Sequence, residues 1–98
     1  MEQKSGLQVN PKDNVATLFA NDISANDEVI IRDKAGHAQT MHTLSAIPYG
    51  HKIAVCDIEI GAPIIKYGEK IGIATVPIKQ GEHVHIHNLD SDRARGDR

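Results

Sequence analysis

The apolar residues of this chain follow a short pattern of an Ile, two residues, a Gly or Asn, two residues, and then Ile or Val. Five copies of the pattern begin at Ile23, Ile47, Ile58, Ile65 and Ile78. Gly or Asn suits the positive φ angle of a tight turn, and the aliphatic residues on either side anchor that turn to a core. Because the copies recur at uneven intervals, the pattern disfavours a solenoid and predicts one compact fold of short strands and tight turns.

Strands are predicted around these turns. Residues 26–32 and 37–44 are expected to form a hairpin that closes near 34–36. Further strands are expected at residues 53–58, 71–75 and 84–88.

Residues 13–19 fit two structures. Val15, Leu18 and Phe19 share a face if the segment is a short helix, whereas Val15, Thr17 and Phe19 share a face if it is a strand. Both alternatives stay open at this point.

The last residues of the chain differ from the rest. Residues 90–98 are apolar only at Ala94, so this segment alone cannot offset the entropy lost on ordering. We therefore expect one domain over residues 1–89 and a polar tail over 90–98 that is flexible or ordered by a partner.

The composition favours an all-β domain, because 13 Ile and 6 Val stand against 4 Leu and β-branched side chains prefer strands. A chain of 98 residues makes one small domain. Its net charge of -2 gives no bulk field for nucleic acid or anionic lipid, so neither nucleic acid nor membrane is an expected partner. The single cysteine, the absence of a signal-peptide pattern and apolar runs far shorter than the ~20 residues of a membrane span predict a cytoplasmic location.

Three of the six histidines alternate with aliphatic residues, at His83, His85 and His87. On a strand these imidazoles would point one way while Val84 and Ile86 point into the core. The three are candidate metal ligands, and an exposed polar strand face is the alternative. A strand rises about 3.3 Å per residue, so without a bend His83 and His87 lie about 13 Å apart, too far to share one ion. Two neighbouring histidines with ligands from elsewhere form a realistic site.

Two lysines lie close to turn glycines. Lys52 follows Gly50 by two residues, and Lys66 precedes Gly68 by two residues. At such positions a side chain can extend over the rim of a cleft. A substrate carboxylate is one ligand for such amines, and a solvated surface is the alternative. Tyr67 could donate a hydrogen bond to an oxyanion or pack over its turn. So short a chain does not readily enclose a large pocket, so catalysis would need a partner.

Several motifs together resemble the N-terminal domain of altronate and galactarate dehydratases, from about Val9 to Asn88. They are, in chain order, DNVA at 13–16, GHKIA at 50–54, DI at 57–58, IKYG at 65–68, IGIA at 71–74 and GEHVHIHN at 81–88. In that family the segment is called a SAF domain and has a β-clip fold. The resemblance thus implies the same all-β, turn-rich architecture that the apolar pattern predicts.

The resemblance implies the β-elimination of water from a small sugar-acid substrate, which gives a 2-keto-3-deoxy acid. It implies a divalent metal, iron(II) or manganese(II), held or approached by His83, His85 and His87. His51 and Lys52 are then expected to be catalytic. Lys66, Tyr67 and Asn88 are expected to bind the substrate.

The large catalytic region of the family is absent from these 98 residues. The resemblance therefore implies a small subunit that works with a separate large catalytic subunit, which would carry the general base. One alternative is the alpha subunit of sulfolactate sulfo-lyase, which has a similar His-Val-His-Val-His-Asn segment. A second alternative is a non-catalytic SAF binding module. A third is a structural subunit that caps the catalytic chain and excludes water, with its histidines exposed and idle. The basic tail at 93–98 favours the altronate type, and the three alternating histidines disfavour galactarate as the substrate.

Overall fold

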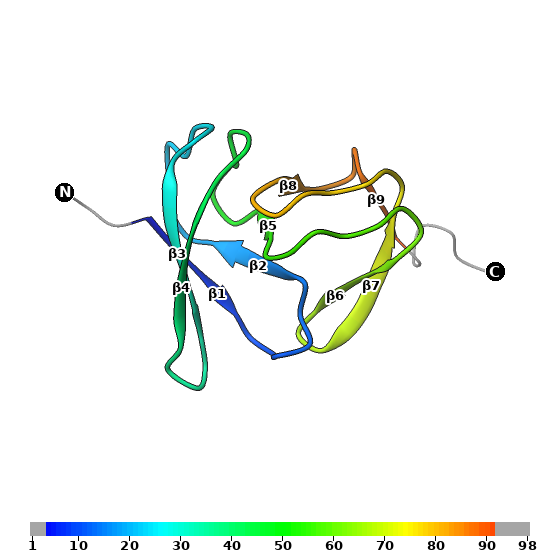
Figure 1. The fold of residues 1–98 in the computed structure, drawn as a ribbon, viewed down its shortest axis with the longest axis horizontal. Helices are drawn as coiled ribbons and strands as arrows, with labels where there is room; N and C mark the ends of the chain where they lie inside the picture. The colour runs from blue at the N-terminus through cyan, green and yellow to red at the C-terminus, as the bar shows by residue number, and fades with distance from the viewer. Residues whose placement is uncertain (1–3, 92–98) are drawn as a thin grey trace.

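The computed structural model describes residues 4–91, and every regular element within them is a β-strand (Figure 1). The strands are β1 (Lys4–Gln8), β2 (Val15–Leu18), β3 (Glu28–Asp33), β4 (Ala38–His42), β5 (Lys52–Ala54), β6 (Pro63–Lys66), β7 (Glu69–Ala74), β8 (His83–Val84) and β9 (Leu89–Ser91). The prediction of an all-β fold is confirmed. These residues include no helix with the length and apolarity that crossing a bilayer requires.

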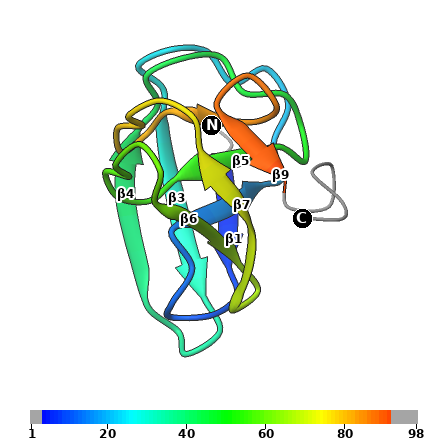
Figure 2. The same ribbon diagram turned by 90° about the vertical axis from the view of Figure 1, so that its right-hand side faces the viewer.

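The strands form two sheets. The larger sheet has six strands in the order β4-β3-β1-β2-β5-β8, and only β1 and β3 pair in parallel. The smaller sheet is antiparallel, with the order β6-β7-β9. The β3–β4 hairpin and the small sheet lie at opposite ends of the molecule, with β2, β5 and β8 between them (Figure 1). In the turned view of Figure 2 the small sheet faces the viewer.

Two apolar clusters form the core, one on each side of β2 and β5. The first contains Ala16, Leu18, Ile23, Val29, Ile31, Met41, Ile47, Ile53 and Val55. The second contains Val15, Ala54, Ile58, Ile64, Ala74, Ile78 and Val84. All four residues of β2 are buried, so this strand has no polar face. That burial explains why residues 13–19 showed no clear period in the sequence, and the structure resolves the segment as a strand.

The predicted turn positions are confirmed at all five copies of the apolar pattern. Positive φ angles occur at Asn26, Gly50, Gly61, Gly68 and Gly81. The copies also pair in space, because isolated bridges join Ile23 to Ile47 and Ile58 to Ile78. Gly81 has a second constraint, since a Cβ atom there would collide with the carbonyl oxygen of His42.

The copy at Ile65 forms a two-residue hairpin turn between β6 and β7. Tyr67 and Gly68 both have positive φ angles, 56° and 78°, as the type I′ turn of a tight hairpin requires. This turn displays the Tyr67 side chain at the hairpin tip, where 56% of its surface is exposed.

The expected hairpin of residues 26–44 is present, with β3 and β4 paired from Glu28–His42 to Arg32–Ala38. The strand expected at 71–75 is β7, whereas only the start of 53–58 is a strand, in β5. The prediction of a strand at residues 84–88 is wrong. β8 ends at Val84, residues 85–88 turn, and Ile86, which was expected to point into the core, is 81% exposed.

Strand β9 runs past residue 89, the expected end of the domain. β9 pairs with β7 through residues 89–91, so residues 90 and 91 belong to the small sheet. The remainder of the expected tail, 92–98, lies outside the described residues.

Candidate functional site

The pairing of β5 with β8 brings two distant histidine motifs together. The antiparallel register pairs Lys52 with Val84 and Ile53 with His83. Extending the same register by one residue places His51 opposite His85. The turn before β5 holds the backbone of His51, because the His51 N–H donates a hydrogen bond to the carbonyl of Pro48.

His51, His83 and His85 form what we call the histidine cluster. The His51 Nδ1 and His83 Nε2 atoms are 2.9 Å apart, within hydrogen-bond distance. The rings of His51 and His85 stack with their centroids 4.4 Å apart, and the centroids of His83 and His85 are 5.6 Å apart. One donor nitrogen from each of the three residues lies within 4.8 Å of the others. The cluster could therefore hold one metal ion.

The membership of the cluster differs from the sequence prediction of His83, His85 and His87. His51, predicted as catalytic, takes the third place. His87 is exposed and lies outside the cluster, although its ring centroid is 5.2 Å from that of His83. No local pattern could have identified His51 as the third member, because its place depends on a strand register between segments far apart in the chain.

Asn88 closes the turn that follows β8. Its side chain is fully buried, its Oδ1 atom accepts a hydrogen bond from the His85 N–H, and its Nδ2 atom donates to the His83 carbonyl. The structure therefore gives both polar atoms of this amide a backbone partner. Its predicted contact with substrate stays a prediction.

Burial and positive neighbours lower the pKa values of two members of the cluster, His83 and His85. Burial is the main cause that lowers the pKa of His83 to about 4, and the nearby His51 adds to this effect. The pKa of His85 is also lowered, first by burial and then by His51 and Lys52. At neutral pH the His83 ring is therefore uncharged, with a lone pair available to bind a metal.

The low pKa of His83 predicts how the stability of the metal-free chain depends on pH. The unfolded chain binds more protons than the folded chain between its ordinary pKa of 6.5 and the folded value of about 4. The contribution of neutral His83 to the free energy of unfolding should thus be complete above pH 6.5. It should decrease as the pH drops from 6.5 to about 4. Urea unfolding in the presence of a chelator, at about pH 7.5 and about pH 5, measures this decrease in the free energy of unfolding. The decrease should be smaller in His83→Gln than in wild type. An equal fall in both proteins would show that His83 is not its source.

Lys52 lies beside the histidine cluster. Its side chain is partly buried, and burial is the main cause that lowers the pKa of its amine, followed by the positive charge of Lys66. The charge of Lys52 in turn lowers the pKa values of His83 and His85. Lys52 thus lies within electrostatic range of both Lys66 and the histidine cluster, and the two amines make this region electropositive.

The β6–β7 hairpin supplies the second amine of this region. The Lys66 Nζ atom lies 4.9 Å from the centroid of the Tyr67 ring, within cation–π range. The buried Asp13 holds the hairpin turn, because its Oδ1 atom accepts the Gly68 N–H at 2.7 Å and its Oδ2 atom accepts the Asn10 N–H at 3.0 Å.

Asn14 binds the same hairpin from the neighbouring position. Its Oδ1 atom accepts the Ile65 N–H at 2.7 Å, and its Nδ2 atom donates to the Pro63 carbonyl at 2.8 Å. The sequence interpretation gave Asp13 and Asn14 no role, although both belong to the DNVA motif at 13–16. Their polar side chains directly before an apolar strand were the available signal.

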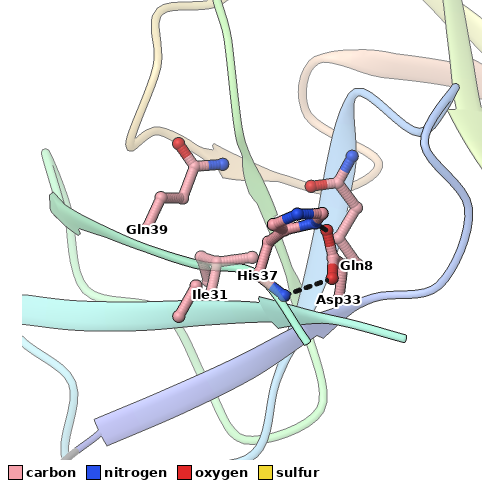
Figure 3. Close-up of a pocket in the computed structure, with 6 residues that line it drawn as sticks. Gln8, Ile31, Asp33, His37 and Gln39 are labelled. Atoms are coloured by element: carbon pink, nitrogen blue, oxygen red, sulfur yellow. Dashed lines mark hydrogen bonds and ion pairs between the residues drawn. The ribbon is translucent and has the colours of Figure 1, made fainter. Parts of the chain in front are cut away.

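A separate hollow beside the β3–β4 hairpin contains none of the predicted site residues. Its lining includes Gln8, Ile31, Asp33, His37 and Gln39 (Figure 3). The Asp33 carboxylate accepts the backbone N–H groups of Ala35 and His37 and lies 3.2 Å from His37 Nδ1. These contacts close the hairpin turn, so we assign them to structure.

The donor set suits a divalent first-row metal. Imidazole nitrogen is a common ligand for iron and its neighbours. Because imidazole adds no negative charge to a metal that it binds and Lys52 is a cation, the region would keep a strong positive charge with a metal bound. Such a region favours the carboxylate of an organic acid.

Comparisons with known proteins agree with this organisation. Residues 4–92 match the family described as the altronate/galactarate dehydratase SAF domain. Altronate dehydratase from Escherichia coli (strain K12) is 39% identical over 82 residues, which are 84% of this chain and 15% of that protein. Altronate dehydratase from Bacillus subtilis (strain 168) is 34% identical over 89 residues, or 91% of this chain and 17% of that protein.

A shorter relative is also similar. The (2R)-sulfolactate sulfo-lyase subunit alpha from Chromohalobacter salexigens is 48% identical over 48 residues, which are 49% of this chain and 51% of that subunit. The chain thus spans a small part of each dehydratase and about half of the subunit. From the fold, the turn motifs and the match over residues 4–92, the chain belongs to the altronate/galactarate dehydratase SAF domain family.

Proposed function

We propose that this chain is the small component of a sugar-acid hydro-lyase, which converts altronate-type acids to 2-keto-3-deoxy acids together with a large catalytic subunit. The observation that carries the proposal is the histidine cluster beside Lys52, with Lys66 near it, in a chain of this family. This region combines a possible metal site with two cations, which is what an elimination next to a carboxylate needs.

The chemical difficulty of the reaction explains the need for positive charge. The proton α to a carboxylate is weakly acidic, and its removal creates a dianionic enediolate. Lys52 and Lys66 bind the carboxylate and stabilise this charge, and the partial burial of Lys52 strengthens its field. Tyr67, at the tip of the same hairpin, donates a hydrogen bond to the acid.

The metal would be held by His51, His83 and His85, and His87 stays outside this set. Bound there, iron(II) or manganese(II) would supply Lewis-acid polarisation of the substrate carboxylate. Imidazole ligands favour iron of the two, because manganese is more often bound by oxygen. Lys52 also donates a proton to the departing β-hydroxyl group, which leaves as water, while the base that removes the α-proton belongs to the large subunit.

The relatives support the existence of a large partner. The matched segment is only 15% of the Escherichia coli dehydratase, so most of that enzyme lies outside the SAF domain. Another relative is by its name the alpha subunit of a sulfo-lyase. The three clustered histidines are partly exposed, which leaves a side of the site for a second chain to cover.

A second candidate is the alpha subunit of a (2R)-sulfolactate sulfo-lyase. The specific observation in its favour is the 48% identity over 48 residues, higher than the identity to either dehydratase. The reaction would again be an elimination next to a carboxylate, with sulfite rather than hydroxide as the leaving group. The lysines and the histidine cluster would serve the same purpose in both.

The test is to purify the tagged chain from its source cells and to identify stoichiometric partners by mass. The complex is then assayed on altronate, galactarate and sulfolactate. We expect a large subunit related to the rest of the dehydratase, and formation of a 2-keto-3-deoxy acid from altronate. Release of sulfite from sulfolactate alone would favour the second candidate. A chain recovered without a partner and without activity would contradict both and favour a binding module.

A further inference from the structure

The chain turns away from the larger sheet directly after the two residues of β8 and then enters β9 of the small sheet. The alternation of His83 to His87 with aliphatic residues favours a continuous strand, yet residues 85–88 form a turn. The backbone N–H of Asn88 donates to the carbonyl of His85 at 3.0 Å within this turn. With this turn, His85 stacks on His51, and His87 is not part of the group whose donor nitrogens lie together, although its ring stays near that of His83.

One side chain connects both histidines of this segment. The Asn88 Nδ2 atom reaches back five residues to the carbonyl of His83, and its Oδ1 atom accepts the N–H of His85, each at 2.9 Å. Asn88 is fully buried, so water does not compete for these bonds. Removing the amide would take away the side-chain partner of a backbone group in each of two cluster residues, His83 and His85.

We propose that Asn88 is a positioning residue that sets the geometry of the histidine cluster for a divalent metal. It contacts neither the metal nor the substrate, and acts by fixing the backbone of His83 and His85. The inference rests on metal binding by the cluster, which is part of the proposed function, but it requires neither the large subunit nor a particular acid. It also changes the role expected for Asn88, from a substrate contact to a support for the ligands.

Thr43 offers a matched control at another turn. It is fully buried like Asn88, and its hydroxyl accepts the Asp27 N–H and donates to the Ser24 carbonyl. Its side chain therefore closes a turn by the same kind of backbone contact, among residues that are not part of the cluster. Thr43→Val should lower stability without changing the metal site.

The experiment is a titration of the 98-residue chain with Co²⁺, followed by visible absorption under conditions where circular dichroism shows each protein folded. We expect wild type and Thr43→Val to bind one equivalent with equal affinity. Asn88→Ala should bind about 10- to 100-fold more weakly, as for other residues that orient metal ligands. The hydroxyl of Asn88→Ser can replace one of the two contacts, so this variant should bind Co²⁺ with an affinity between those of wild type and Asn88→Ala.

Equal Co²⁺ affinity of wild type and a folded Asn88 variant would overturn the inference. Should Asn88→Ala not fold, Asn88→Ser decides the question by the same comparison. An equal loss of affinity in Thr43→Val would also overturn it, since the effect would then come from general destabilisation. A wild-type chain that binds no Co²⁺ overturns the inference, whereas dehydration by the purified complex tests the proposed function separately.

Discussion

Replacing Lys52 by Met in the assembled enzyme should lower kcat for dehydration of the sugar acid by about 10²- to 10³-fold, the loss typical of one removed charge-stabilising group. Lys52 is partly buried beside the histidine cluster, and its amine shares the electrostatic field of Lys66. Met keeps most of the aliphatic length, so packing changes little while the cation is lost. The stabilisation of the enediolate and the proton for the leaving group are lost together.

The measurement is steady-state turnover of the complex with altronate, accompanied by thermal unfolding of each variant. Lys34→Met is the matched control, because Lys34 is exposed in the turn of the β3–β4 hairpin. This turn lies away from β5 and β8, the strands that position the cluster (Figure 1). Lys34→Met should leave turnover unchanged. If Lys52→Met retained full turnover in a folded complex, Lys52 would have no catalytic role.

Replacing Asp13 by Ala should lower the free energy of unfolding by about 2 to 4 kcal/mol, because two backbone N–H groups lose a charged acceptor. These groups belong to Gly68 and Asn10, and Asp13 itself is only 5% exposed. Loss of the contact also frees the hairpin that carries Lys66. In the assembled enzyme we therefore expect the KM for the acid to rise as well.

Urea unfolding measures this loss, with Asp57→Ala as its control. Asp57 is exposed and accepts one N–H, from Gln80 at 2.9 Å, so its removal should cost less than about 1 kcal/mol. Asp13→Asn keeps one acceptor oxygen, so its loss in the free energy of unfolding should lie between those of Asp13→Ala and Asp57→Ala. Equal destabilisation by Asp13→Ala and Asp57→Ala would show that Asp13 does not anchor the hairpin.

The turns could be predicted from the sequence because their requirements are local. Asn26, Gly50 and Gly81 occupy positions of positive φ, where few residue types are tolerated. The β3–β4 hairpin follows from the same kind of signal, alternating residues around a short turn.

Elements that depend on distant partners could not be predicted in this way. β1 has a mostly polar sequence, and it forms because it lies between β2 and β3. Its Gly6 is required by that contact, since a Cβ atom would lie 2.6 Å from the carbonyl oxygen of Thr17. Nothing within residues 4–8 indicates either neighbour.

The candidate site was predictable in its residue types but not in its geometry. His51, His83 and His85 were all singled out from their motifs, yet the triad assigned to the metal included His87. Two features account for the difference: the register of β5 and β8, and the side chain of Asn88. Both are contacts across the fold, and both override the alternating pattern that favours a straight strand.

If the proposed site is correct, His51 binds one metal ion together with His83 and His85. X-ray absorption at the cobalt edge of the chain loaded with one equivalent of Co²⁺ tests it directly. We expect a shell with three imidazole nitrogens at about 2 Å in wild type and in His87→Ala, and two in His51→Ala. A wild-type shell with fewer than three imidazoles, or one that is unchanged in His51→Ala, would contradict it.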